Sequence, residues 1–453
     1  MPSQLMKSVS GIRGIVGETM TPELIIQVSG AFAAYMKRGK IVIGRDGRCT
    51  GHAISSMVES ALVMYGCEVI DVGIAPTPTV QVMVEELNAD GGIIISASHN
   101  PIEWNAFKLV NGDGTFLNSS QINRFFALLD RKDYDPQPWD KMGQAYSADN
   151  AYDVHIKRIV DKVDIASIKK RHYRTALDSV NASGSYITTQ FLEYLNCRVS
   201  PVYCEITGTF PRVAEPLPQN LTDLSHAVIR HGADIGFAQD PDADRLAIVD
   251  ENGRPIGEEY TLALVTRHLL SREPGRVIIN MSTTKAVEDI AAEFGCDCVR
   301  TSVGEINVVD EMKKGARIGG EGNGGIISPE IHLGRDSLAG IAYVLEYMSE
   351  SGKTVSELVS ELPHYCMKKG KVQFKHSRLN TIYSRIKRSF KGEKINDLDG
   401  IRIDFAGPGP FAGGWVHLRP SNTEPVFRII TESPSMEQTE ELYAYFEKFM
   451  ASM

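Results

Sequence analysis

The sequence predicts an α/β fold that is divided among several domains, and three observations lead to this prediction. The chain has 453 residues, too many for one ordinary hydrophobic core and suited to roughly three or four domains of about 100 to 150 residues. Short apolar, β-branched runs recur and end in Gly, Asp, Ser or Asn, as buried parallel strands do. Several of these runs lead into segments of helical period, so strand, loop and helix alternate.

Four runs are predicted as buried strands: KIVIGRDGR near residue 40, GGIIISASHN near 91, YRTALDSVN near 173 and RVIINMSTT near 276. The helices predicted from their period are Ala53–Tyr65, Ile187–Leu195 and Lys285–Phe294. In open α/β sheets, ligands bind beyond the carboxyl ends of the strands. We therefore expect the polar residues that end these runs to form a functional site.

Changes of composition along the chain predict four domains. The polar, Pro-containing segment 130–139 ends the first domain, and the turn and helix start at 251–260 mark a second junction. After a third junction near 365–372, alternating strands, helices and hairpin-like glycines suggest a smaller α+β domain. We expect three similar mixed-sheet α/β domains and a C-terminal α+β domain, with the bounds 1–140, 141–252, 253–368 and 369–453.

The composition is that of a globular protein and argues against two classes of function. Hydrophobic residues make up 42% and charged residues 23% of the chain, and the net charge of −9 disfavours nucleic-acid binding, which needs a basic patch. No apolar stretch approaches the roughly 18 residues that cross a bilayer, and no apolar signal region is present near the start. The seven cysteines form neither a disulfide framework nor a zinc motif. We therefore expect a cytoplasmic protein that binds neither nucleic acid nor membrane.

The first candidate site is the segment ISASHNPIEWNAFK, residues 95–108, which directly follows a predicted strand. Ser98 at the strand's end would be held rigidly, with His99 beside it and Lys108 further along. Taken alone, Ser-His-Asn-Pro is an ordinary turn composition, and no G-x-S-x-G frames the serine as in an esterase. The segment therefore indicates a function only if partners occur elsewhere in the chain.

The second candidate, AQDPDADRLAIVD at residues 238–250, has carboxylates at every other position, Asp240, Asp242 and Asp244. On an extended loop they can direct three hard oxygen ligands at one cation, and this arrangement suits Mg²⁺. A Ca²⁺-binding EF-hand is disfavoured, because Arg245 stands at the sixth loop position, where Gly is needed. A solvated acidic turn remains the other interpretation.

Two further runs have the residues to hold a sugar and a phosphate. In IGGEGNGGIISP, residues 318–329, glycines permit close approach of a ligand, and Glu321 and Asn323 can hydrogen-bond vicinal hydroxyls; a plain turn is equally compatible. HLRPSNTEPVFRII, residues 417–430, combines guanidinium, hydroxyl and amide donors as phosphate sites do, with a surface turn as the alternative. Its donors are Arg419, Ser421, Asn422, Thr423 and Arg428.

Together, in this order and over most of the chain, the runs SASHNPIEWNAFK, DPDADR, GEGNGG and RPSNTEP resemble the α-D-phosphohexomutase family, which includes phosphoglucomutase, phosphomannomutase and phosphoglucosamine mutase. The resemblance implies three similar α/β domains and a fourth α+β domain around a central cleft. Two positions depart from the family pattern: Gly325 stands where many relatives have His, and Asn105-Ala106 replaces the usual Asn-Gly.

The resemblance also implies roles for the candidate residues. Ser98 would carry the phosphate, and Asp240, Asp242 and Asp244 would bind Mg²⁺ together with the phosphate on Ser98. Lys108 is the expected general acid or base, with Arg13 and His99 secondary. The residues expected to bind the substrate are Arg245, Glu321, Asn323, Arg419, Ser421, Asn422, Thr423 and Arg428.

The implied activity is phosphoryl transfer between C6 and C1 of a hexose phosphate through a phosphoserine and a 1,6-bisphosphate intermediate. The runs are most similar to phosphoglucosamine-mutase-like sequences of the archaeal type, so glucosamine 6-phosphate is the expected substrate, and mannose or glucose phosphate the alternative. A phosphosugar phosphatase and a non-catalytic phosphosugar-binding protein are more distant alternatives. The expected cofactors are Mg²⁺ and hexose 1,6-bisphosphate as an activator, the expected partner is a small phosphosugar, and the chain is expected to be a monomer or homodimer.

Overall fold

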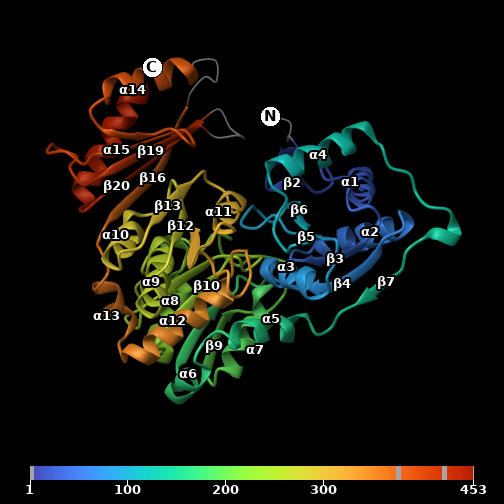
Figure 1. Cartoon of the computed structure of the whole chain (residues 1–453). Coiled ribbons are helices and arrows are strands. Elements are labelled where there is room, and N and C mark those ends of the chain that lie inside the picture. The colour runs from blue at the N-terminus through green and yellow to red at the C-terminus, as the bar shows by residue number, and fades with distance from the viewer. Residues whose placement is uncertain (1–4, 374–378, 421–425, 452–453) are drawn as a thin grey trace.

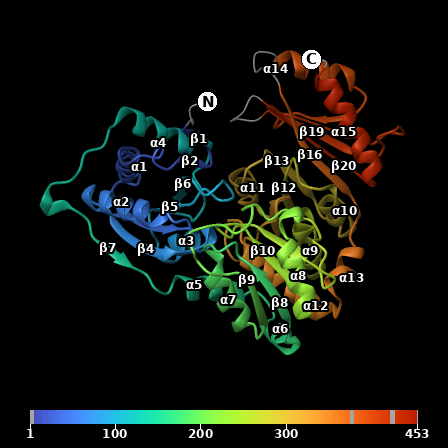
Figure 2. The ribbon, with the colours of Figure 1, turned by 180° about the vertical axis from the view of Figure 1, so that it is seen from behind.

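The computed structural model describes residues 5–373, 379–420 and 426–451, which form four β-sheets with accompanying helices (Figure 1). The first sheet has seven strands, the second and third have four each, and the C-terminal sheet has five. Figures 1 and 2 show the second and third sheets together, with the first and the C-terminal sheets on different sides of them. Within the described part of the chain, none of the helices combines the length and the apolar composition that crossing a membrane requires.

The first sheet is formed by residues 6–147, in the order β1-β2-β6-β5-β3-β4-β7. Its strands are β1 (Met6–Ser8), β2 (Gly11–Ile15), β3 (Lys40–Arg45), β4 (Glu68–Ile74), β5 (Gly91–Ile95), β6 (Trp104–Asn111) and β7 (Ala145–Ser147). Its helices are α1 (Pro22–Tyr35), α2 (Gly51–Met64), α3 (Thr77–Glu86) and α4 (Ser119–Arg131), followed by the 3₁₀ turn η1 (Trp139–Lys141). β7 lies beyond residue 140 yet pairs with β4 of this sheet.

The second sheet has the order β11-β10-β8-β9. Its strands are β8 (Arg174–Asp178), β9 (Arg198–Tyr203), β10 (Ile235–Gln239) and β11 (Leu246–Val249). The helical segments before and between these strands are α5 (Ala151–Val160), α6 (Ile165–Arg171), α7 (Gly184–Tyr194), η2 (Pro218–Asn220) and α8 (Thr222–His231). β9 is the edge strand and pairs with β8 alone among the described strands.

The third sheet has the order β13-β12-β14-β15. Its strands are β12 (Val277–Asn280), β13 (Cys298–Thr301), β14 (Ile318–Glu321) and β15 (Gly325–Ile327). The helices of this domain are α9 (Glu258–Arg272), α10 (Lys285–Glu293), α11 (Glu305–Met312), α12 (Ser337–Ser351) and α13 (Val355–Ser360). The Asp336 side chain accepts hydrogen bonds from two backbone amides in the first turn of α12 and so caps this long helix.

The C-terminal sheet is antiparallel throughout, in the order β16-β20-β19-β18-β17. Its strands are β16 (Cys366–Gln373), β17 (Lys394–Asn396), β18 (Ile401–Asp404), β19 (Trp415–Pro420) and β20 (Val426–Ser433). The helices α14 (Leu379–Ser389) and α15 (Met436–Ala451) accompany it, and their apolar residues form a separate core with the sheet. The prediction of a smaller α+β domain is therefore confirmed.

The first three sheets contain the same four-stranded unit. In each, two strands lie parallel on either side of a first strand, and one of them turns back into an antiparallel fourth strand. The corresponding orders are β6-β5-β3-β4, β11-β10-β8-β9 and β15-β14-β12-β13. This repetition confirms the predicted α/β fold with three similar mixed-sheet domains.

The distribution of buried apolar side chains shows how the domains are joined. The second and third domains share one continuous core, whereas the first sheet has a core on each face. The C-terminal domain contacts the third through polar bonds: His417 Nδ1 lies 3.0 Å from Ser282 Oγ, and Arg402 Nη1 donates to Met281 O at 2.7 Å. Because apolar surface is costly to expose, the second and third domains form the most tightly joined pair.

Candidate active site

Three of the four candidate segments are the loops of equivalent hairpins. The loop from β5 to β6 contains Ser98, the loop from β10 to β11 contains the three aspartates, and the loop from β14 to β15 contains Asn323. Each loop has one residue with left-handed backbone, at φ of 49° for Ser98, 52° for Ala243 and 84° for Gly324. Such a conformation is unfavourable for residues other than glycine and occurs often at functional sites.

Ser98 lies directly against the aspartate loop. Its hydroxyl donates to Asp240 Oδ2 at 2.8 Å and lies 3.4 Å from His99 Nδ1, and the residue is only 2% exposed. On the other side of the serine loop, Arg13 Nη1 donates to Asn100 Oδ1 at 2.9 Å. Arg245 and burial lower the pKa of His99 well below its usual value, so its imidazole is neutral.

Arg48, which the sequence analysis did not single out, fastens the serine loop. It is 1% exposed, and its Nε pairs with Asp46 Oδ2 at 3.1 Å. A guanidinium can donate five hydrogen bonds in a fixed geometry, and here it donates to four backbone carbonyls of the loop. Its acceptors are Ser98 O at 2.6 Å, Asn100 O at 2.7 Å, Pro101 O at 2.6 Å and Trp104 O at 3.0 Å.

The three aspartates form a buried cluster that fits a divalent cation. Asp240, Asp242 and Asp244 are each 0% exposed, and one carboxylate oxygen from each lies within 4.8 Å of the others. Asp242 Oδ1 and Asp244 Oδ1 are buried and accept no hydrogen bond from any described residue. Buried carboxylate oxygens without partners are costly, and a cluster of three carboxylates suits a hard cation such as Mg²⁺. The donor set therefore fits the expected metal.

Cationic and hydroxyl groups surround this cluster. The Lys108 ammonium contacts Asp242 Oδ2 and lies 3.5 Å from Asp244 Oδ2, so it forms ion pairs with two of the three aspartates. Thr77 Oγ1 donates to Asp242 Oδ2 at 2.5 Å. Burial and the carboxylates of Asp244 and Asp242 raise the pKa of Asp240 well above its usual value. Burial alone would lower the pKa of Lys108, but Asp242 and Asp244 raise it and keep the amine protonated.

Two arginines join the aspartates to the neighbouring segments. Arg245 donates to Glu215 Oε1 at 3.0 Å, and its Nε lies 3.9 Å from Asp240 Oδ2. Arg335, a second residue that sequence reasoning missed, donates to Asp244 Oδ2 at 2.5 Å and to Glu321 Oε2 at 2.7 Å. Arg335 therefore connects the metal candidate to the candidate sugar loop.

The sugar loop is held by the same network. Glu321 Oε1 accepts from Asn280 Nδ2 at 2.8 Å and from the backbone N–H of Gly304 at 2.9 Å. Asn323 Oδ1 accepts from the N–H of Gly325 at 3.2 Å and is partly exposed. A Cβ added to Gly325 would lie 2.3 Å from Arg335 Cδ. Glycine at this position therefore leaves room for the Arg335 side chain.

The C-terminal sheet carries cations on adjacent strands. Lys371, Arg428 and Arg419 are directly opposite one another across β16, β20 and β19. Like charges in such positions repel each other, and a bound anion would reduce this repulsion. Arg419 Nε donates to Asp399 Oδ1 at 3.0 Å. The candidates Ser421, Asn422 and Thr423 lie outside the described residues.

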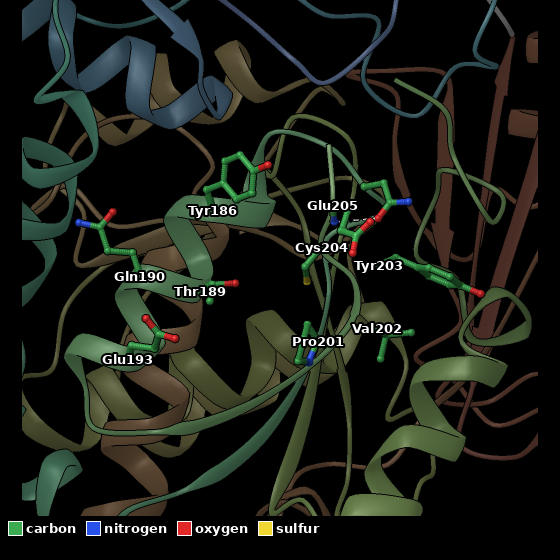
Figure 3. Close-up of a pocket in the computed structure, with 10 residues that line it drawn as sticks. Tyr186, Thr189, Gln190, Glu193, Pro201, Val202, Tyr203, Cys204 and Glu205 are labelled. Carbon is green, nitrogen blue, oxygen red and sulfur yellow. Dashed lines mark hydrogen bonds between the residues drawn. The ribbon is translucent and has the colours of Figure 1, made fainter. Parts of the chain in front are cut away.

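A surface cavity of about 600 Å³ lies between α7 and β9 (Figure 3). Its lining includes Tyr186, Gln190, Glu193 and Glu205 and none of the candidate site residues. Two carboxylates at its rim would repel a phosphate dianion. The cavity is therefore not the site that the four sequence segments describe.

Comparison with known proteins agrees with this geometry. The phosphoglucomutase/phosphomannomutase family matches the chain with its α/β/α domains I, II and III at residues 5–135, 153–253 and 257–365, and with its C-terminal domain at 370–448. The chain is 38% identical over 441 residues to a phosphoglucomutase/phosphomannomutase of Thermococcus kodakarensis, covering 95% of both chains. It is 34% identical over 440 residues to a protein of Methanopyrus kandleri named probable phosphoglucosamine mutase, covering 96% of this chain and 95% of that one.

A solved structure shows the same fold. The phosphoglucomutase/phosphomannomutase family protein from Burkholderia thailandensis is 25% identical and superimposes with a TM-score of 0.85 over 98% of this chain and 97% of that chain. All four domains of the family thus occur here in order, and the serine and aspartate loops meet in space. The chain therefore belongs to the phosphoglucomutase/phosphomannomutase family and is a phosphohexomutase, an isomerase.

Proposed function

We propose that this phosphohexomutase moves a phosphoryl group between C6 and C1 of a hexose phosphate in the cytoplasm, with Ser98 as the carrier and glucosamine 6-phosphate as the preferred substrate. The observation that carries the proposal is the 2.8 Å contact between the Ser98 hydroxyl and Asp240 inside a buried cluster of three aspartates. This places a hydroxyl that can carry a phosphoryl group at a cluster suited to a cation. Charge neutralisation and positioning dominate phosphoryl transfer.

The residues of the first two domains would handle the transferring group. Asp240, Asp242 and Asp244, with a phosphate on Ser98, would hold Mg²⁺, which when bound neutralises charge on the transferring oxygens. A free sugar hydroxyl attacks the phosphorus, its O–P bond forms, and the bond from phosphorus to Ser98 Oγ breaks. Lys108, which lies near the aspartates, is the proposed general acid or base: as an ammonium it can give a proton to the departing Ser98 oxygen, and it becomes a base for the next hydroxyl only after that transfer. Arg13 and the neutral His99 assist on the serine side.

The residues of the last two domains would hold the sugar and its other phosphate. Glu321 and Asn323 are the proposed contacts to the hydroxyls, and Arg245 joins them in binding the substrate. The non-reacting phosphate would be bound by Arg419, Ser421, Asn422, Thr423 and Arg428. The resulting 1,6-bisphosphate must turn around before the other phosphate returns to Ser98, so these contacts have to accept either end of the sugar. Added hexose 1,6-bisphosphate would phosphorylate Ser98 and so act as an activator.

The names of the relatives support two substrate choices. The Methanopyrus relative is named a probable phosphoglucosamine mutase, which supports glucosamine 6-phosphate. The Thermococcus relative, at 38% identity, is named phosphoglucomutase/phosphomannomutase, and this favours mannose or glucose phosphate as the second candidate. Substrates that differ by one polar group at C2 are told apart by a few hydrogen bonds.

The test is a coupled isomerisation assay of the purified protein with Mg²⁺ and a trace of hexose 1,6-bisphosphate. Glucosamine, glucose and mannose phosphates are compared side by side, and inorganic phosphate is measured in parallel. We expect turnover that is lost in Ser98→Ala and retained in the control Ser60→Ala, an exposed serine on α2. Full turnover in Ser98→Ala would refute the carrier, and stoichiometric phosphate release would identify a phosphatase instead.

A further inference from the structure

A second group of possible metal ligands is buried where three domains meet, and it shares no residue with the proposed active site. It consists of His155 on α5 and of His332 and Asp336, which precede α12. Their exposed fractions are 0%, 3% and 1%. His155 Nε2 lies 2.9 Å and His332 Nε2 lies 3.4 Å from the same atom, Asp336 Oδ2.

Hydrogen bonds account for two of these three residues. His155 Nδ1 is paired with Thr79 Oγ1 of α3 at 2.9 Å. Asp336 Oδ1 accepts from the N–H groups of Leu338 at 2.9 Å and Ala339 at 3.2 Å. The two atoms that face the cluster, His155 Nε2 and Asp336 Oδ2, are paired with each other at 2.9 Å, so a bound ion would replace this hydrogen bond.

His332 has no comparable partners. Its Nε2 has only the 3.4 Å contact with Asp336 Oδ2, and neither ring nitrogen makes a hydrogen bond of good geometry with a described residue, although the side chain is almost fully buried. The amide of Gln81, also fully buried, makes no hydrogen bond within the described part of the chain either. The two lie together, because a Cβ at Gly334 would be 2.4 Å from Gln81 Oε1 and 2.8 Å from His332 Cε1. Buried polar groups without partners are unusual and indicate a missing ligand.

We propose that His155, His332 and Asp336 bind a transition-metal ion, with Zn²⁺ as the best fit, and that Gln81 or a water completes the coordination. Zn²⁺ is bound by histidine nitrogens and carboxylate oxygens at about 2.0–2.2 Å in tetrahedral geometry, which places neighbouring ligand atoms about 3.3 Å apart. The distances of 2.9 and 3.4 Å to Asp336 Oδ2 are close to this value.

The surroundings of the cluster match those of known metal sites. A ligating histidine usually donates its other N–H to an oxygen, and ligating carboxylates are themselves hydrogen-bonded. Thr79 provides the first contact, and the amides at the start of α12 provide the second. Mixed imidazole and carboxylate ligation favours Zn²⁺ over Mg²⁺, which prefers oxygen ligands alone. The two metal sites of the chain would therefore take different ions.

The location indicates a structural role for this metal. His155 follows the linker from the first sheet, its partner Thr79 belongs to the first domain, and Asp336 belongs to the third. An ion bound here would fasten the three domains together, and it would stabilise the folded chain because its ligands separate on unfolding. Since all its ligands are buried, the ion would exchange slowly and load most readily during folding.

The experiment is a metal-binding measurement on the full chain. Protein freed of metal during refolding is equilibrated with Zn²⁺ in excess Mg²⁺, and bound zinc and the unfolding temperature are measured. We expect one Zn²⁺ per chain and a higher unfolding temperature for the wild type and for the control His52→Ala, an exposed histidine on α2. In His332→Ala, zinc affinity should fall by more than the roughly 10–100-fold that changes to outer-shell groups cause.

Two further variants separate this site from the aspartate cluster. Asp240→Asn should still retain one Zn²⁺, whereas Asp336→Asn, which keeps an oxygen for capping α12, should lose it even if His332→Ala fails to fold. Visible absorption of the Co²⁺-loaded wild type should show tetrahedral coordination. The proposal is overturned if the wild type binds no zinc, or if zinc is lost in Asp240→Asn but kept in His332→Ala. Because Ser98 is untouched, these outcomes are independent of the mutase assay.

Discussion

Replacing Arg48 by lysine should loosen the loop that positions Ser98 without removing the positive charge. The guanidinium donates to four backbone carbonyls of this loop while pairing with Asp46. A lysine ammonium has three donors at a single point, so it cannot serve both the Ser98–Asn100 and the Pro101–Trp104 sides of the loop. At least two hydrogen bonds from a charged donor are lost, at roughly 1.5 kcal/mol each, or about 3 kcal/mol in total.

This loss can be measured as a local opening of the loop. About 3 kcal/mol corresponds to an increase on the order of 100-fold in the population of the open loop. The amides of Asn100 and Trp104, which donate to Ala97 O and Pro101 O at 3.1 Å each, should exchange with solvent faster by this factor. The kcat of the mutase should fall while KM changes little, because small misplacement of a reacting group costs rate more than binding.

A matched control is available in the C-terminal domain. Arg402 is also 1% exposed, and Arg402→Lys should leave exchange in the serine loop unchanged. If Arg48→Lys is folded but shows wild-type exchange at Asn100 and Trp104 together with wild-type kcat, Arg48 does not position the loop.

Three other changes have definite expected outcomes. Gly325→Ala should displace Arg335, because the new Cβ would lie 2.3 Å from its Cδ. It should raise KM and lower the free energy of unfolding by about 1–3 kcal/mol. The control Gly392→Ala, where a Cβ meets no atom within 4 Å, should change neither quantity. Thr77→Val removes a hydrogen bond to Asp242 in the aspartate loop and, if this loop holds Mg²⁺ as proposed, should raise the Mg²⁺ concentration for half-maximal activity by about 10–100-fold. An unchanged Mg²⁺ titration would contradict this role. Burial lowers the pKa of His417 from 6.5 to about 4, so stability from the neutral imidazole is complete above pH 6.5 and should fall by up to about 3 kcal/mol as the pH drops towards 4. Thermal unfolding between pH 7 and 4 should show this loss in the wild type and a shallower slope in His417→Gln.

The sequence predicted the features that are continuous along the chain. The strands β3, β5, β8 and β12 and the helices α2, α7 and α10 are present where apolar periodicity placed them. The fold class of the first three domains followed from the same alternation. Ser98 and the three aspartates could be named as candidates, because each motif is complete within one short segment.

The contacts between distant segments could not be predicted in this way. Arg48 holds a loop 50 residues away, Thr77 bonds an aspartate 165 residues away, and Arg335 bonds one 91 residues away. Lys108 was expected to act as general acid or base, but its contact with Asp242, 134 residues on, could not be predicted from the sequence. The sequence around these residues does not indicate which distant residue each contacts. The one feature that Arg48 and Thr77 share is their place just after the ends of β3 and β4, where the functional polar side chains of α/β sheets are usually found.

The three hairpin loops of the candidate site come from three different domains, so the site can form only after these domains have assembled. Ser98 belongs to the first domain, its acceptor Asp240 to the second, and Leu246 N–H of the second donates to Gly324 O of the third at 2.9 Å. No single domain contains both Ser98 and the three aspartates, so under the proposed mechanism a nascent or cleaved chain would have neither a cation site beside the serine nor a complete sugar site. Fragments divided in the connection between α4 and β7 should each be inert, and activity should return only when they are mixed. An incomplete chain would therefore leave phosphosugars unchanged, because Ser98 and Asp240 meet only when the first two domains are assembled.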